Sequence, residues 1–203
     1  MAACTRRVVT AATAILFISS LCAFGEGPVA SVQALGIDPA TPSTIYAALS
    51  SGVFKSLDAG GTWIPASHGL SGDVWSLAID PKRPTTLYAA TSMGVFKSLD
   101  GAATWAPAAV APAGVSIQAL LVDPAVPAVV YAAASAGVLR STDQAATWTP
   151  LTDGLTNLFV QSLAIDPRFP DTLFAGTYGG SVFALPLTAS PSRSSVRTVA
   201  PRR

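Results

Sequence analysis

Charged residues, thiols and imidazoles are all scarce in this sequence. Only 11% of the 203 residues are charged, the formal net charge is +1, and there is one histidine. The lack of an excess of positively charged residues argues against a nucleic-acid partner, and a single histidine cannot hold a metal ion by itself. We therefore predict no nucleic-acid partner, no metal site and no cofactor.

Cysteine occurs only at Cys4 and Cys22, inside a segment that is typical of an export signal. A positive pair, Arg6 and Arg7, precedes the uncharged apolar run Val8–Phe24, and small residues flank the end of that run. Cleavage would leave a mature chain without thiols or disulfides. We expect a periplasmic or extracellular protein. The alternative is an uncleaved segment that anchors the chain, and this would be its one membrane contact.

Sustained helical periodicity is also missing. Short apolar runs alternate with Gly, Pro, Asp and Ser, which is the pattern of short strands joined by tight turns. Around the middle of the chain the expected strands are Val74–Ile79, Thr86–Ala90, Gly94–Ser98 and Thr104–Ala106.

What the sequence does contain is repetition. A segment with Ser, Asp, Thr and Trp at fixed positions occurs three times, and its aspartates are 42 and 43 residues apart. Asp-Pro pairs recur with the same period, and there are four of them. Four short strands per repeat of this length are typical of a β-propeller blade. We predict an all-β propeller or partial propeller of about four four-stranded blades, the last of them incomplete.

The repeats define the domain boundaries. They are a signal peptide at 1–25, a linker or closing strand at 26–31, blades at 32–73, 74–115 and 116–159, an incomplete blade at 160–187, and a disordered tail at 188–203. Three outcomes remain open for the ring: a small closed propeller sealed by residues 27–31, an open half-ring that pairs with a second copy, or a remnant of a longer protein. An open arc would favour self-association.

The repeated polar residues are expected to be structural rather than catalytic. Each aspartate can tie its turn together, and each tryptophan can pack between blades. If the turn requires positive φ where the first copy has glycine, the alanines of the other copies cost on the order of 1 kcal/mol each. The turn residues are Ser56, Asp58, Gly60, Thr62, Trp63, Ser98, Asp100, Thr104, Trp105, Ser141, Asp143, Thr147 and Trp148, and the Asp-Pro turns contain Asp38, Asp80, Asp123 and Asp166.

Strand alternation places both kinds of aspartate turn on one rim and the less regular loops on the other. We expect binding on this variable rim, because its loops are free of the demands of the scaffold. Trp75 and Phe159 sit in or next to first strands, so blade packing is the role expected of them, and as a sugar platform they would have to face the open cleft. The candidates are His68, Asp73, Trp75, Asp153, Asn157, Phe159 and Tyr178.

Ser56–Trp63 resembles the Asp-box, or bacterial neuraminidase repeat, in every defined position, and Leu87–Ser98 resembles blades of several exported propellers. These include family-74 xyloglucanases, sortilin-type domains and photosystem II stability factors. The resemblance covers residues 32–185 and implies the fold, whereas activity differs among these groups.

Sialidase activity is rejected because a sugar carboxylate needs converging arginines. Arg83 and Arg168 follow Asp-Pro motifs on the structural rim and Arg140 lies in a strand, so no three are expected to converge. We predict an exported, non-enzymatic interaction module that binds a protein or a glycan, with no catalytic residues. The alternative is a glycoside hydrolase-like protein acting through Asp73 and Asp153, or a truncated fragment of one.

Overall fold

The computed structural model describes residues 31–109 and 115–187 and the backbone of 197–199, and these residues form strands and no helix. Accordingly, this part of the chain has no helix that could span a membrane. The predicted signal peptide and most of the predicted closing strand lie outside the described residues.

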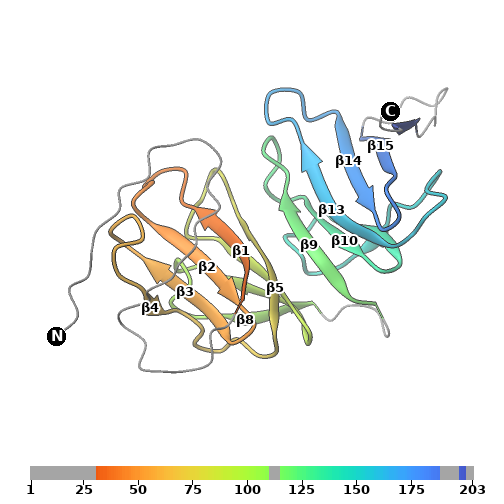
Figure 1. The fold of residues 1–203 in the computed structure, drawn as a ribbon. Helices are drawn as coiled ribbons and strands as arrows, with labels where there is room; N and C mark the ends of the chain where they lie inside the picture. Colours follow the sequence, from red (N-terminus) through yellow and green to blue (C-terminus); the bar gives the residue numbers. More distant parts are fainter. Residues whose placement is uncertain (1–30, 110–114, 188–196, 200–203) are drawn as a thin grey trace.

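Four antiparallel sheets follow one another along the chain (Figure 1). Sheet 1 contains β1 (Val32–Ile37), β2 (Ile45–Leu49), β3 (Gly52–Ser56) and β4 (Ile64–Pro65). Sheet 2 contains β5 (Val74–Ile79), β6 (Leu87–Thr91), β7 (Gly94–Ser98) and β8 (Ala106–Ala109). Sheet 3 contains β9 (Ile117–Val122), β10 (Val130–Ala134), β11 (Gly137–Ser141) and β12 (Thr149–Pro150). Sheet 4 contains β13 (Val160–Ile165), β14 (Thr172–Thr177), β15 (Val182–Pro186) and the short β16 (Arg197–Val199).

The strands of each sheet pair in chain order, as a meander of hairpins. The repeat itself supplies only three strands of sheet 4, as predicted. The fourth, β16, comes from the tail and pairs with β15, Phe183 lying opposite Thr198. β16 occupies the otherwise unpaired edge of β15, which offers backbone partners to a segment whose composition alone cannot form a core. The rest of the predicted disordered tail lies outside the described residues.

The fourth strand of sheet 2 also differs from its prediction, because it begins at Ala106 instead of Thr104. Thr104 is still held by the preceding turn, where its amide donates to the carboxylate of Asp100 at 2.8 Å. The amide of Trp105 donates to the carbonyl of His68, outside sheet 2. The side-chain bonds of the turn thus delay the strand.

A β-bulge interrupts the first strand of every sheet. The pairing skips one residue between Val74 and Ser76, and the same irregularity occurs in β1, β9 and β13. An extra residue reverses the inward and outward alternation beyond it. Consequently the aliphatic side chains of one face are spaced by three and then by two residues. They are Val32, Leu35 and Ile37; Val74, Leu77 and Ile79; Ile117, Leu120 and Val122; and Val160, Leu163 and Ile165.

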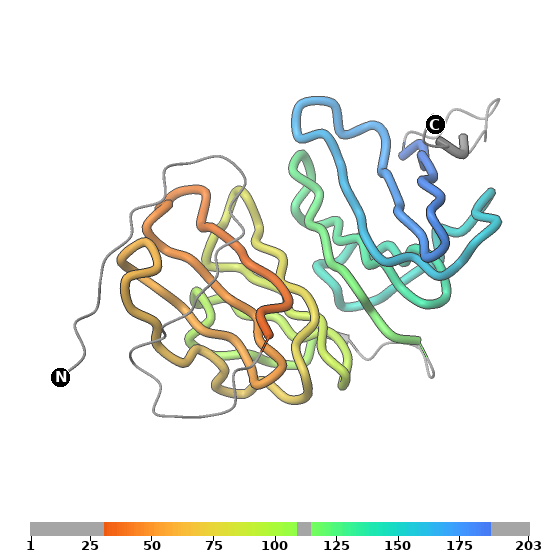
Figure 2. The backbone as a smooth tube through the Cα atoms, in the orientation of Figure 1, coloured from red at the N-terminus to blue at the C-terminus, as the bar shows by residue number. Residues whose placement is uncertain are grey.

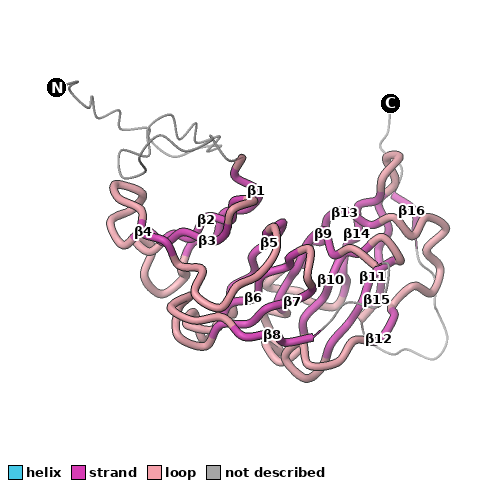
Figure 3. Tube along the Cα trace, turned by 90° about the horizontal axis from the view of Figure 1, so that it is seen from below, coloured by secondary structure: helices cyan, strands magenta, loops and turns pink. Residues whose placement is uncertain are grey.

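The sheets stand side by side in an arc, with the first strand of each next to the first strand of its neighbour (Figure 3). Apolar residues fill each of the three junctions between neighbouring sheets. Each buried Val, Leu, Ile or Phe side chain contributes about 1.5–3 kcal/mol. Within the described residues, packing between sheets therefore supplies the core.

The arc is open. Sheets 1 and 4 lie at opposite ends of the backbone trace (Figure 2). On sheet 1, Leu35 is 48% exposed and Ile37 is 59% exposed; on sheet 4, Phe174 is 39% exposed. The equivalent side chains of the middle sheets are covered by a neighbouring sheet. The described residues thus form a partial ring.

Candidate functional site

The three Ser-x-Asp-x-x-x-Thr-Trp segments form turns with the same hydrogen bonds. We call them the Ser-Asp-Thr-Trp turns. In the second, the Ser98 hydroxyl and the Thr104 amide both donate to Oδ1 of Asp100, at 2.8 Å each, and the Thr104 hydroxyl donates to Oδ2 at 2.6 Å. Oγ of Ser98 accepts in turn from the amide of Ala102 at 2.9 Å. The first and third turns repeat each of these bonds.

These bonds hold the turn aspartates in their charged form. The amide and hydroxyl of Thr104, together with Ser98, lower the pKa of Asp100 from 3.8 to about 2. The pKa values of Asp58 and Asp143 are also lowered to about 2, by the same donors of their own turns. A carboxyl group with such a pKa has no proton to give near neutral pH, so these residues are hydrogen-bond acceptors and not general acids.

The glycine position of the turn has positive φ in all three copies. Gly60 has a φ of 89°, Ala102 of 66° and Ala145 of 69°. The residue before it is left-handed as well, with a φ of 57° at Ala59. Two consecutive left-handed residues give the amides the direction needed to reach the serine oxygen, and the alanines carry the associated strain.

The tryptophan that ends each turn packs in an apolar cluster. Trp105 is 5% exposed and lies in the core between sheets 1 and 2, where its indole N–H donates to the carbonyl of Ala66 at 2.8 Å. Trp148 packs against the core between sheets 2 and 3. Trp63 packs with Ala47 and Leu49 on the side of sheet 1 that no described sheet covers.

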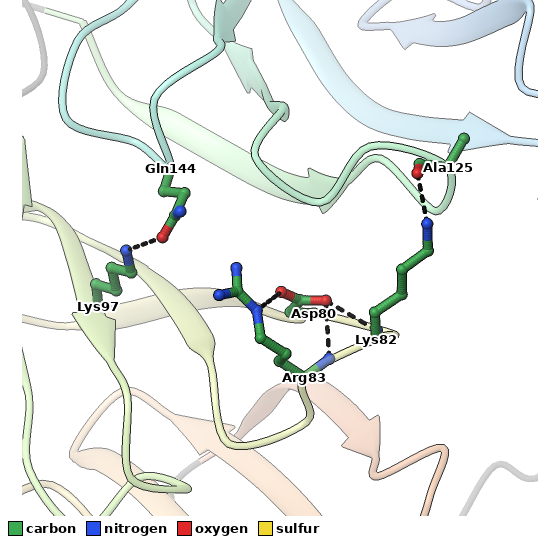
Figure 4. Close-up of polar contacts among 6 residues, drawn as sticks. All are labelled: Asp80, Lys82, Arg83, Lys97, Ala125 and Gln144. Atoms are coloured by element: carbon green, nitrogen blue, oxygen red, sulfur yellow. Dashed lines mark hydrogen bonds and ion pairs between the residues drawn. The ribbon is translucent and has the colours of Figure 1, made fainter.

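Lysines of the third strands fasten sheets 1 and 2 to the turn of the following sheet. Nζ of Lys55 donates to the carbonyl of Gly101 at 3.0 Å, and Nζ of Lys97 donates to Oε1 of Gln144 at 2.7 Å. Figure 4 shows Lys97 reaching from sheet 2 toward the third turn, with Lys82 bonded to the Ala125 carbonyl nearby. Sequence reasoning missed this role, although the recurrence of lysine at one repeat position was a usable signal.

The Asp-Pro aspartates close their own turns in the same way. Oδ1 of Asp80 accepts from the amides of Lys82 and Arg83, at 2.8 and 3.0 Å, and its Oδ2 pairs with Nε of Arg83 at 3.3 Å. Asp38 and Asp123 each accept two amides of their turns, and Asp166 accepts one. Their carboxylates satisfy backbone donors that proline-containing turns would otherwise leave unpaired.

Both kinds of aspartate turn lie on one rim. The amide of Gly101 donates to the carbonyl of Thr85 at 2.9 Å, which joins the second Ser-Asp-Thr-Trp turn to the loop after Asp80. Ala59 and Gln144 make the equivalent bonds in their sheets. The opposite, variable rim contains the loops in which binding was expected.

Three of the predicted rim residues come together on this variable rim. The rings of Phe159 and Tyr178 meet edge to face, with their centroids 5.9 Å apart. Nδ2 of Asn157 donates to the Tyr178 carbonyl at 2.6 Å, and its Oδ1 accepts from the Phe159 amide at 2.9 Å. Tyr178 is 67% exposed, Phe159 is 42% exposed and Leu158, which precedes Phe159 in the chain, is 46% exposed. We call Asn157, Leu158, Phe159 and Tyr178 the aromatic rim patch.

Phe159 belongs to none of the buried clusters between sheets, so the structure does not place it in the blade packing expected of it. Leu158 was not predicted, because a single leucine in a loop has no signal in sequence. Trp75 is the extra residue of the β5 bulge, is half-buried and belongs to none of the buried clusters between sheets.

The remaining rim candidates do not assemble into a catalytic group. His68 is exposed, and its carbonyl accepts the Trp105 amide. The Asp73 carbonyl accepts from the Ser92 amide at 3.0 Å, and the Asp73 amide donates to the Ser92 hydroxyl at 3.1 Å. The residue is exposed. Asp153 lies in the exposed loop between sheets 3 and 4, and no contact links it to Asp73 in the described structure.

A shallow hollow of about 220 Å³ lies beside the second turn, with Lys97, Trp105 and Pro107 in its lining. It contains no carboxylate or imidazole. Nowhere in the described ranges do three His, Cys, Asp or Glu residues gather as metal ligands.

Solved structures with the same arrangement of sheets decide the fold. An enzyme of glycoside hydrolase family 74 from Niastella koreensis matches 84% of this chain with a TM-score of 0.66 and 22% identity. YCF48 from Cyanidioschyzon merolae matches 88% with a TM-score of 0.63 and 13% identity, and YCF48 bound to D1 peptide matches 83% with a TM-score of 0.61 and 12% identity. This chain has a β-propeller fold.

The matches cover only part of those proteins. The chain spans 30% of the Niastella enzyme, 59% of the Cyanidioschyzon YCF48 and 54% of the peptide-bound YCF48. No family model and no curated protein matches the sequence. The predicted resemblance to family-74 xyloglucanases is thus confirmed for the fold alone.

Proposed function

We propose that this protein is an exported, non-enzymatic binding module of Asp-box type, and that the aromatic rim patch is its binding surface. The observation that carries the proposal is the exposed edge-to-face pair of Phe159 and Tyr178. Aromatic side chains of this size are usually buried, and their exposure next to one another is typical of interaction sites.

The patch is held in place before any partner arrives. Asn157 bonds to both aromatic residues through their backbones, and the Tyr178 amide donates to the Phe159 carbonyl at 2.9 Å. A surface that is already ordered loses little conformational entropy on binding, so more of the free energy of its contacts appears as affinity.

A protein segment is the favoured partner. Aromatic faces flanked by a leucine suit apolar side chains, and only Asn157 in the patch has a polar side chain with more than one hydrogen-bonding group. Peptide binding on a propeller has a precedent in the peptide-bound YCF48 structure, at the level of fold only.

The lowered pKa values of Asp58, Asp100 and Asp143 support a non-enzymatic function, because the most regularly placed carboxylates serve the turns. The Ser, Asp, Thr and Trp contacts in all three turns likewise support the proposed Asp-box assignment.

The binding function is tested with a peptide array and an array of β-glucan oligosaccharides. We expect at least one peptide ligand, with affinity reduced about tenfold or more by Tyr178→Ala, as truncation of a central aromatic anchor commonly does. Met93→Ala is the matched control, because Met93 is 64% exposed in the equivalent region of sheet 2. Equal losses in both variants, or a peptide ligand insensitive to Tyr178→Ala, would contradict the assignment of the patch.

A glycoside hydrolase-like activity is the second candidate, and the fold similarity to family-74 enzymes favours it. It would use Asp73 and Asp153, which both lie in loops of the variable rim. Release of reducing sugar from β-glucans that disappears in Asp73→Asn would support the enzyme over the binding module.

A further inference from the structure

Every junction between sheets joins the same two kinds of face. One, the leading face, presents the three aliphatic side chains of a first strand, as Val74, Leu77 and Ile79 do in sheet 2. The other, the trailing face, presents an aromatic residue, a small residue and a valine. These trailing residues are Tyr46, Ala48 and Val53 in sheet 1; Tyr88, Ala90 and Val95 in sheet 2; and Tyr131, Ala133 and Val138 in sheet 3.

The open arc leaves one face of each kind uncovered. On the leading face of sheet 1, Val32, Leu35 and Ile37 are 39%, 48% and 59% exposed. The outer part of this face, around Trp63, is already buried, so β1 is its exposed portion. On the trailing face of sheet 4, Phe174 and Val182 are 39% and 37% exposed. Gly176 lies opposite Val182, just as Ala48 lies opposite Val53 in sheet 1.

We propose that a second copy of this chain covers these two faces, with the trailing face of sheet 4 in one copy packed on the leading face of sheet 1 in the other. The occupant follows from the molecule itself, because the same pair of faces already packs together at three internal junctions. The two faces differ, so the contact between copies is head to tail. Such a contact leaves no face uncovered only when the copies form a closed ring. Two copies of four sheets make eight, which lies within the range of closed propellers.

The junction between copies lacks one feature of the first two internal junctions. Lys55 lies opposite Tyr46, and Lys97 lies opposite Tyr88, and both lysines bond to the next sheet. In sheet 4 the corresponding pair is Phe174 and Ala184, which provides no such donor. The contact between copies therefore depends on apolar packing alone, and the assembly should dissociate on dilution.

The test is the mass of the purified full chain by light scattering, across a wide range of concentrations. We expect a reversible dimer with twice the mass of one chain. Leu35→Glu and Phe174→Glu should each give monomers, because each places a charge in an apolar contact on an already exposed side chain. Leu99→Glu is the control, since Leu99 is 66% exposed in the second turn and lies on neither face; it should remain dimeric.

Mixing the two monomeric variants separates this arrangement from other dimers. Leu35→Glu keeps its trailing face and Phe174→Glu keeps its leading face, so the mixture should regain dimers joined by a single junction. Regained dimers also show that both variants are folded. A monomeric wild-type chain, a series of longer assemblies, or a mixture that stays monomeric would overturn the proposal.

Discussion

A single aspartate organises each Ser-Asp-Thr-Trp turn. Asp100 accepts from two hydroxyls and one amide, and Asp58 and Asp143 do the same in their copies. The side chains are exposed, yet their pKa values are about 2, because the bonds require the charged form. The function of these residues is thus local: they hold the third and fourth strands of a sheet together.

Acid should destabilise the fold through these aspartates. Their folded pKa of about 2 lies below the ordinary 3.8, so their stabilisation is complete above about pH 4 and is lost as the pH falls to about 2. We expect the free energy of unfolding, measured by chemical denaturation, to fall through that window. Asp100→Asn should make the fall shallower, and Thr104→Val, which removes one donor, should have a smaller effect in the same direction. An unchanged acid profile in Asp100→Asn would contradict this origin.

Relief of left-handed strain should stabilise the first turn. Ala59 is exposed with a φ of 57°, and Ala59→Gly should raise the free energy of unfolding by about 0.5–1 kcal/mol, after the entropic cost of glycine. Ala102→Gly is the contrasting variant, because Ala102 has a φ of 66° but is fully buried in the core between sheets 1 and 2. The buried contacts of the lost methyl group should cancel the stability gained from strain relief. We therefore expect the free energy of unfolding of Ala102→Gly, measured by thermal or urea unfolding, to stay close to that of the unchanged chain.

At the scale of the element, Trp105 and Trp148 each connect their sheet to the sheet before it. Trp105→Ala should destabilise by about 3 kcal/mol or more, as truncations of large core residues do. Trp105→Phe keeps most of the apolar contact and loses the bond to the Ala66 carbonyl, so it should cost about 1–2 kcal/mol. Urea unfolding of the two variants provides the comparison. A loss within measurement error for Trp105→Ala would place the indole outside the junction.

The strands themselves were largely predictable, because turn residues and short apolar runs are local signals. β5 and β7 occupy the predicted ranges, and β6 lies one residue later than expected. The late start of β8 was not predictable, since the Trp105 amide bonds to the carbonyl of His68 in the loop between sheets 1 and 2. The bulge at Trp75 could not be predicted from the sequence either, because a register shift is a property of two paired strands.

At the scale of the whole molecule, the end sheets are covered on one face and the middle sheets on both. Hydrogen exchange should reflect this difference: we expect amides of β1 and β14 to exchange faster than those of their counterparts β5 and β10. The exchange should be measured at a concentration at which the chain is monomeric, so that no second copy protects the end sheets. Uniform protection over all four sheets under that condition would show that the ends are covered by something other than a neighbouring chain.

The sequence by itself determined the number of repeats, the all-β class and the positions of the turns, because each depends on residues close together in the chain. Only the tertiary structure decided that the described sheets form an open arc, that β16 completes sheet 4, and that Asn157, Phe159 and Tyr178 form one surface. Those outcomes depend on contacts between residues that are distant in sequence, and the covering of a face depends on where the neighbouring sheet lies.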